Sequence, residues 1–212
     1  MEKILKIALM VALLPLFLKA EFVVKSYQEI KNEKVVRQNY EESCGAASLA
    51  TLINTLDDNN LTELDLLKTM SGQKLYTDMV SFADLNDAVK KLDYESKSYK
   101  VDRKILENII SVPILVKIED DPRFPHFVVI INHKGNYLQI LDPSYGEYIS
   151  SKREFYSVWD RYNKGGFALI VNPKKTTQRL QTQFTQTFKF RNRTFWILIS
   201  QLSDINFFLF TS

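Results

Sequence analysis

Apolar residues recur at helical spacing in the first half of the chain, and they form short continuous runs in the second half. The helical spacing predicts helices over residues 43–56 and 60–70, a third from residue 81, and a short fourth from residue 102. The continuous runs predict strands over residues 113–118, 126–131, 137–141 and 167–171. Helices followed by strands are typical of an α+β fold.

Polar residues mark where the predicted helices begin. Asn60 with Glu63, and Ser81 with Asp84, have the three-residue spacing of a capping box. The apolar faces of the third and fourth helices are assigned to the core, not to a ligand site. These faces consist of Phe82, Leu85, Val89 and Leu92 in the third helix, and of Ile105 and Ile109, with Leu106 as a further candidate, in the fourth.

The first twenty residues have the outline of a secretory signal peptide. Lysines precede an apolar run over residues 7–18, and Lys19-Ala20 follows it. This run is too short to span a bilayer comfortably, so we expect cleavage near Ala20 and a periplasmic or secreted protein. Leu18 occupies a position where a small residue is preferred, which leaves an uncleaved interfacial anchor as the alternative.

The remaining 192 residues are enough for one domain with a sizeable core, and the hydrophobic share of the full chain, 45% of 212 residues, is ordinary for a soluble fold. We expect a catalytic domain over residues 21–173 and a C-terminal extension over residues 174–212.

The formal net charge is +3, of which the signal segment supplies +2, leaving +1. This balance gives no reason to expect a nucleic-acid partner. Two histidines and one cysteine, far apart in sequence, argue against a structural metal site, and we expect no cofactor.

The C-terminal extension changes character along its length. Residues 176–187 are rich in Gln and Thr, and strongly apolar runs follow at residues 195–199 and 207–210. One interpretation is a terminal helix that docks on the domain, or a poorly ordered extension. The other is a hydrophobic arm that contacts a partner or a membrane, because an exposed apolar patch of that size favours aggregation.

Cys44, the only cysteine, directly precedes a run of small residues that begins a predicted helix. The first-turn N–H groups and the helix macrodipole stabilise a thiolate at such a position. A lone cysteine is more often a small buried hydrophobe. In an oxidising compartment, however, an unpaired thiol is exposed to oxidation, and its retention favours a chemical role. We therefore expect Cys44 to be a partly exposed nucleophile.

Three further residues complete a candidate site. His126 opens one predicted strand and Asp142 closes the next, so Cys, His and Asp follow the chain order of papain-like enzymes. An imidazole can take the thiol proton and later protonate a leaving amine, while a carboxylate orients that imidazole. Gln38, six residues before Cys44, can donate to an oxyanion together with the Cys44 backbone N–H. His133 lies beside a turn and is expected to be solvated.

The turn between the two strands decides whether His126 and Asp142 can meet. Side chains alternate between the faces of a sheet, so a two-residue loop would pair Asp142 with Val129 and direct it away from His126. A loop with an odd number of residues centred on Gly135 pairs Asp142 with Val128 and keeps both side chains on one face. We predict such an odd loop, or a compensating bulge, with the Asp142 carboxylate hydrogen-bonded to the His126 ring.

These residues resemble the bacteriocin-processing cysteine peptidases, papain-like enzymes that cut leader peptides after a double glycine. The resemblance covers residues 33–172. The matching pieces are the spacing from Gln38 to Cys44-Gly45, the run His126-Phe127-Val128-Val129, Leu141-Asp142-Pro143 and Gly146. The run Phe155-Tyr156-Ser157-Val158-Trp159 also matches, because that family has a short aromatic helix at this point after its Asp-Pro.

The resemblance implies a papain-like α+β fold, in which a helical half carrying the cysteine packs on an antiparallel sheet carrying His and Asp. The active site would lie in the cleft between the two halves. By this resemblance Gln38 is the oxyanion residue, Cys44 the nucleophile, His126 the base and acid, and Asp142 the orienting group.

The chain also departs from the well-known members of that family, whose peptidase domain is fused to an ATP-driven exporter. It has no six-span hydrophobic region and no glycine-rich phosphate loop. We therefore expect a stand-alone exported cysteine peptidase that acts on a co-secreted peptide or protein. The more specific hypothesis is that this substrate is glycine-rich and is cut after a Gly-Gly leader. The alternatives are a non-catalytic peptide-binding module of the same fold that assists secretion, and a thiol acyltransferase. The sequence defines no oligomeric state.

Overall fold

The computed structural model describes residues 3, 24–71, 80–119 and 124–174. The predicted signal peptide and the extension beyond residue 174 lie outside the described residues. The chain divides into two compact units, Met1–Ile30 and Lys31–Ser212. Among the helices of the described residues, none has the length and apolar character needed to cross a membrane.

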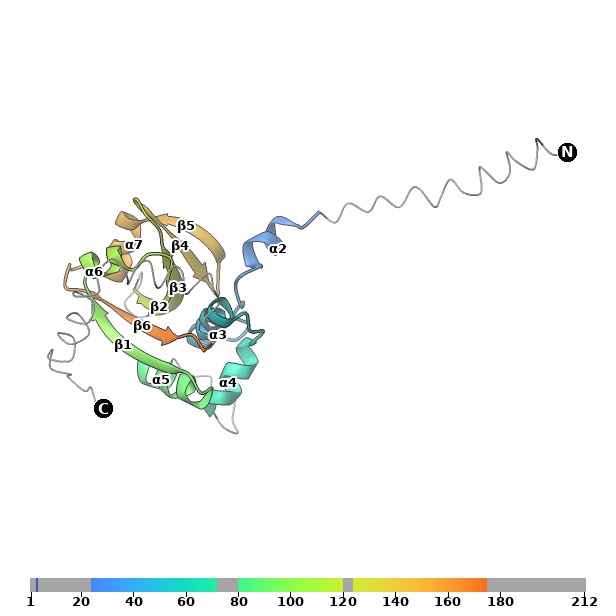
Figure 1. The fold of residues 1–212 in the computed structure, drawn as a ribbon, viewed down its shortest axis with the longest axis horizontal. Coiled ribbons are helices and arrows are strands. Elements are labelled where there is room, and N and C mark those ends of the chain that lie inside the picture. Colours follow the sequence, from blue (N-terminus) through green and yellow to red (C-terminus); the bar gives the residue numbers. More distant parts are fainter. Residues whose placement is uncertain (1–2, 4–23, 72–79, 120–123, 175–212) are drawn as a thin grey trace. The chain divides into compact units, whose positions relative to one another are not determined.

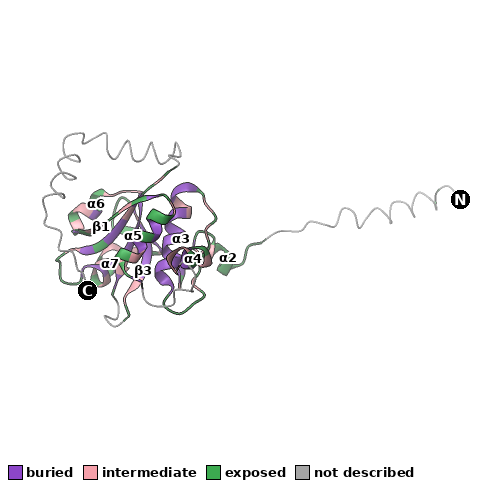
Figure 2. Cartoon of the chain, turned by 90° about the horizontal axis from the view of Figure 1, so that it is seen from below, coloured by how far each residue is buried: buried purple, intermediate pink, exposed green. Residues whose placement is uncertain are grey.

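Helix α2 (Tyr27–Asn32) begins in the first unit. Ser26 and Glu29 cap it reciprocally, since the Ser26 N–H donates to the Glu29 carboxylate over 2.6 Å and the Glu29 N–H donates to the Ser26 hydroxyl over 3.2 Å. Helix α2 buries none of its residues, and Figure 2 shows it as exposed. Local capping, not core packing, therefore defines this helix.

The predicted helices of the second unit are confirmed, with small shifts of their ends. They are α3 (Cys44–Asp57), α4 (Glu63–Ser71), α5 (Phe82–Lys91) and α6 (Arg103–Asn108), and α7 (Lys152–Trp159) corresponds to the aromatic helix that the resemblance implied. The expected core residues of the fourth helix are confirmed in part: Leu106 is buried in α6, whereas Ile105 and Ile109 are partly buried and pack against the same core.

The two predicted capping boxes had different outcomes. Ser81 and Asp84 cap α5 reciprocally, as expected. The pairing of Asn60 with Glu63 is wrong. Helix α4 begins at Glu63, so Thr62 occupies the cap, and Thr62 and Asp65 exchange hydrogen bonds over 2.9 and 3.2 Å. Glu63 is buried and turned toward a neighbouring loop instead.

In the described part of the chain, six strands form one antiparallel sheet in the order β1-β6-β2-β3-β4-β5 (Figure 1). Their bounds are β1 (Glu95–Val101), β2 (Pro113–Ile118), β3 (His126–Asn132), β4 (Tyr137–Asp142), β5 (Gly146–Ser151) and β6 (Gly166–Asn172). The four predicted strands are confirmed. Strands β1 and β5, which form the two edges of the sheet, were not predicted.

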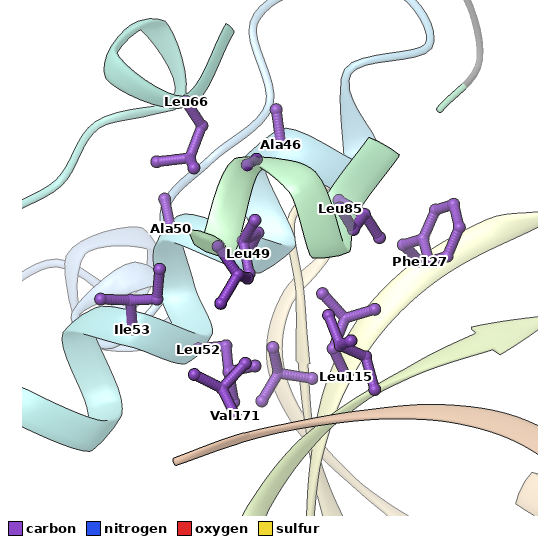
Figure 3. Packing of buried hydrophobic residues seen from close by; sticks show 14 of the residues in the cluster. Ala46, Leu49, Ala50, Leu52, Ile53, Leu66, Leu85, Leu115, Phe127 and Val171 are labelled. Carbon is purple, nitrogen blue, oxygen red and sulfur yellow. The ribbon is translucent and has the colours of Figure 1, made fainter. Parts of the chain in front are cut away.

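Alternating strand residues face two separate cores, so both faces of the sheet are covered. Val129 faces the core beneath α3, α4 and α5, while Val128 faces the core beneath α6 and α7. Helix α3 is buried on nearly all sides (Figure 2). Figure 3 shows its apolar side chains between Leu66 of α4, Leu85 of α5 and the sheet. The α+β prediction is confirmed, and α3, which begins at the cysteine, is the central element of the first core.

Candidate active site

The pairing of β3 with β4 follows the predicted odd register. Val129 pairs with Leu141 and Asn132 with Leu138, so the turn is centred on Gly135, which has a φ of +96°. Glycine adopts this left-handed region without steric cost. Continuing the register places Asp142 opposite Val128, on the same face as His126. Both residues end up at the same end of the strand pair, since one opens β3 and the other closes β4.

His126 and Asp142 are in direct contact. The Nε2 atom of His126 lies 3.0 Å from the Oδ1 atom of Asp142, whose carboxylate is 2% exposed. The same oxygen accepts the backbone N–H groups of Ser144 over 2.7 Å and Tyr145 over 3.1 Å. These donors fix the carboxylate in a turn of its own chain. Because Nε2 contacts Asp142, Nδ1 is the ring nitrogen left for the thiol.

The environment of His126 favours the protonated imidazole. Burial lowers the pKa of His126, but hydrogen bonding to Asp142 and to the Cys44 side chain, with the negative charge of both, outweighs burial and raises that pKa to about 9. At neutral pH the ring is therefore an imidazolium beside Cys44. The thiolate is the nucleophilic form of cysteine, and His126 is the group in contact with the Cys44 side chain that can exchange a proton with it.

Cys44 is the first residue of α3, as predicted, but it is only 6% exposed. The expectation of a partly exposed thiol is wrong. Cys44 belongs to the buried core cluster, and its neighbour Gly45 is packed so tightly that a Cβ atom there would lie 2.1 Å from Cγ2 of Val80. Ser43 provides no side-chain cap for α3, so its side chain leaves the first-turn N–H groups uncovered.

Gln38 is held by the loop that follows Asp142. Its backbone N–H donates to the Pro143 carbonyl over 3.0 Å, and its side-chain Oε1 accepts the Ser144 hydroxyl over 2.9 Å. Its Nε2 donates to the Tyr40 carbonyl over 3.2 Å. An amide NH₂ has two protons, so a second N–H remains for a substrate oxygen.

The four predicted site residues therefore belong to one connected set of contacts. Ser144 joins them, because its hydroxyl binds Gln38 and its N–H binds Asp142. Sequence reasoning missed Ser144, although a polar residue after Asp-Pro is typical of a side-chain-stabilised turn. A buried hydrogen bond from Ser48 Oγ to the Phe127 carbonyl, 2.8 Å long, also ties α3 to the strand residue next to His126.

A surface cavity of about 410 Å³ lies elsewhere, at the β3–β4 turn. It is lined by Glu107, Ile110, Lys134, Gly135, Asn136 and Lys152. It contains neither thiol nor imidazole, so the candidate site is defined by the contacts of His126. Within the described residues, no group of His, Cys, Asp and Glu side chains could hold a metal ion.

A cysteine at the start of a central helix, with a histidine and an aspartate paired on the adjoining sheet, is the arrangement of a papain-like cysteine peptidase. The sequence model of the peptidase C39 family matches residues 32–176. The chain belongs to this family and is a cysteine peptidase. The resemblance drawn from the sequence is thereby confirmed.

Two curated relatives differ in how much of their length the chain covers. It is 27% identical over 169 residues to the probable functional amyloid protease FapD of Pseudomonas aeruginosa, covering 74% of each chain. It is 27% identical over 145 residues to the lactococcin-G-processing and transport ATP-binding protein LagD of Lactococcus lactis, covering 67% of this chain. The match spans only 19% of LagD.

Solved structures show the same fold. The peptidase domain of Streptococcus ComA, a bifunctional ABC transporter, is 25% identical with a TM-score of 0.55, over 66% of this chain and 98% of that domain. A double glycine motif protease from an AMS/PCAT transporter, in complex with its leader peptide, is 25% identical with a TM-score of 0.54. That match covers 66% of this chain and 91% of the protease. The papain-like fold prediction is confirmed.

Proposed function

We propose that this protein is an exported peptidase that cuts a co-secreted peptide or protein after a Gly-Gly leader, with Cys44 as nucleophile. The observation that carries the proposal is the position of His126, whose ring contacts Asp142 through Nε2 and interacts with Cys44. The site is thus equipped for covalent acyl transfer.

In the proposed reaction, the Cys44 thiolate attacks the carbonyl carbon of the scissile bond. The Nε2 amide of Gln38 and the Cys44 backbone N–H stabilise the oxyanion of the tetrahedral intermediate. The C–N bond then breaks, and His126 gives its proton to the leaving amine. Neutral His126 next takes a proton from water, whose oxygen attacks the thioester and releases the acid and the thiolate. Asp142 orients the ring throughout.

The Gly-Gly preference is supported by the relatives. The double glycine motif protease was captured with a leader peptide, and LagD is named for lactococcin-G processing. Export is supported by the sequence of residues 1–20, and a polypeptide substrate is supported by FapD, which is named as a probable functional amyloid protease.

Synthetic peptides test the specificity. A leader-like peptide with Gly-Gly and a matched peptide with Gly-Ala at the same place are incubated with the protein, and the products are identified by mass. We expect one cut after Gly-Gly, and a rate at least about tenfold lower for Gly-Ala, because an added methyl costs that much in a tight pocket. No cleavage, or equal cleavage of both peptides, contradicts the proposal. Product joined to an added amine instead of water would indicate the acyltransferase alternative.

Expression in bacteria tests export separately. We expect the periplasmic or secreted protein to begin after residue 20, as read from its N-terminal peptide. A protein that retains residues 1–20 in the membrane fraction would indicate the uncleaved anchor. A protein confined to the cytoplasm contradicts export without affecting the peptidase assignment.

A further inference from the structure

The loop 39–43 folds around the carboxylate of Glu63, the first residue of α4. The Asn39 backbone N–H donates to both carboxylate oxygens, over 2.9 and 3.1 Å, and its side-chain amide donates over 2.9 Å. The Tyr40 N–H donates over 3.3 Å, and the Ser43 hydroxyl, which also lies 2.7 Å from the Tyr40 carbonyl, is within donating distance of the carboxylate as well. The Glu63 carboxylate therefore binds both the beginning of this loop, at Asn39 and Tyr40, and its end, at Ser43.

Glu63 is 3% exposed, and a buried carboxylate is costly unless its oxygens are hydrogen-bonded. In the described part of the chain, every hydrogen bond to Glu63 comes from this loop. The α4 N-terminus adds a favourable dipole, but it does not orient the loop. Removing the carboxylate takes the acceptor from the Asn39 and Tyr40 N–H groups, so the loop loses the contacts that hold its shape.

The two ends of this loop carry the proposed oxyanion donors. Gln38 immediately precedes Asn39, and Cys44 immediately follows Ser43, so the shape of the loop sets the separation of the two donors. Within the loop, Glu42 has a φ of +63°, a left-handed conformation that a non-glycine residue keeps only when its surroundings impose it. The contacts of Glu63 are suited to impose it.

We propose that Glu63 is a positioning residue of the oxyanion hole, which it shapes through the loop 39–43 without touching substrate. The proposal rests on the peptidase function proposed above. This role predicts different effects of Glu63 on two reactions of the thiol. Addition to a carbonyl creates an oxyanion and depends on Glu63, whereas simple alkylation of the thiol creates none and does not depend on it.

Two small reagents measure these reactions on the only cysteine of the chain. In acylation by 4-nitrophenyl acetate, the thiolate attacks the ester carbonyl, the C–O bond breaks and nitrophenolate leaves. In alkylation by iodoacetamide, the thiolate displaces iodide without an oxyanion. We expect Glu63→Gln to lower the acylation rate at least about tenfold, approaching the effect of Gln38→Ala, and to leave alkylation within about twofold of the wild type.

Thr62→Ala is the matched control, because it removes the cap of the same helix without touching the loop 39–43. It should lower the melting temperature and leave both rates unchanged. Ser43→Ala removes one donor to Glu63 and should lower acylation less than Glu63→Gln, which keeps the test available if Glu63→Gln does not fold. For that variant too, alkylation should stay within about twofold.

The proposal is overturned if Glu63→Gln is acylated at the wild-type rate. Where that variant does not fold, acylation of Ser43→Ala at the wild-type rate has the same meaning. A parallel fall of acylation and alkylation also overturns the proposal. It is also overturned if Gln38→Ala is acylated at the wild-type rate, because Gln38 then supplies no oxyanion donor. Neither reagent is a peptide. Failure to cleave Gly-Gly peptides would therefore count against the proposed function without deciding the role of Glu63.

Discussion

The Nε2 atom of His126 lies 3.0 Å from the Oδ1 atom of Asp142, although the two residues are sixteen positions apart in sequence. The turn centred on Gly135 brings them together, because it sets a register in which both side chains share one face of the sheet. A shift by one residue would direct Asp142 to the opposite face. The geometry of a remote turn therefore determines whether the imidazole has its carboxylate partner.

Asp142→Asn tests the electrostatic part of this contact. Burial lowers the pKa of His126, but Asp142 and Cys44 raise it to about 9, so the proton needed by the leaving amine is lost as the pH rises through that value. We expect the alkaline limb of kcat/KM near pH 9 in the wild type and at lower pH in Asp142→Asn. Because Asp142→Asn removes the charge that stabilises the imidazolium and holds its tautomer, kcat at neutral pH should fall as well, by up to about 10⁴-fold.

The same contact affects stability. The pKa of His126 is raised from 6.5 in the folded state, so the interaction stabilises the fold in full below about pH 6.5 and is lost as the pH rises through about 9. The difference in unfolding free energy between wild type and Asp142→Asn should shrink over this range. The account is contradicted if the alkaline limb has the same pKa in Asp142→Asn as in the wild type and the difference in unfolding free energy is constant with pH. Asp142 would then not set the protonation of His126.

Gln38→Ala tests the oxyanion hole. One donor stabilises the transition state by about 3 kcal/mol, so kcat should fall about 100- to 1,000-fold, with little change in KM. Ser144→Ala removes the hydrogen bond that holds the Gln38 side chain and should give a smaller fall in kcat. Steady-state kinetics on a Gly-Gly peptide measure both. An unaltered kcat in a folded Gln38→Ala variant removes Gln38 from the site.

Gly45→Ala tests the packing beneath the thiol. The added methyl would overlap Val80, which is buried and β-branched and therefore cannot rotate away freely. We expect a loss of about 1–3 kcal/mol in unfolding free energy and a marked loss of activity, because Cys44 must shift. Adding Val80→Ala makes room for the methyl and should restore part of the activity. A double variant no better than Gly45→Ala alone would show that the two residues are not coupled.

Local signals in the sequence predicted most of the elements that position the site. The spacing of apolar residues located α3, α5 and the four inner strands, and the odd turn centred on Gly135 was predicted because that register lets His126 meet Asp142. With that turn, strand parity placed His126 and Asp142 on one face of the sheet. These features depend on residues close together in sequence, which is why they could be inferred without a structure.

The features that the sequence did not reveal depend on distant contacts. Strand β1, with the sequence ESKSYKV, is largely polar and is defined by pairing with β6, and β5 is a partly exposed edge strand. Gly45, which follows Cys44, packs closely against Val80, far along the chain. Glu63 matched a capping pattern at the wrong place, and only the folded chain directs its carboxylate to the loop before Cys44.

The central claim is that Cys44 is the nucleophile of a peptidase, and Cys44→Ala tests it most directly. The substitution removes one sulfur atom from a buried position, so the fold should persist, as checked by circular dichroism and the melting temperature. The rate of cleavage of one Gly-Gly peptide is then measured for wild type and Cys44→Ala side by side. The account predicts cleavage by the wild type and a rate at the uncatalysed background for a folded Cys44→Ala variant; cleavage by Cys44→Ala at the wild-type rate would contradict it.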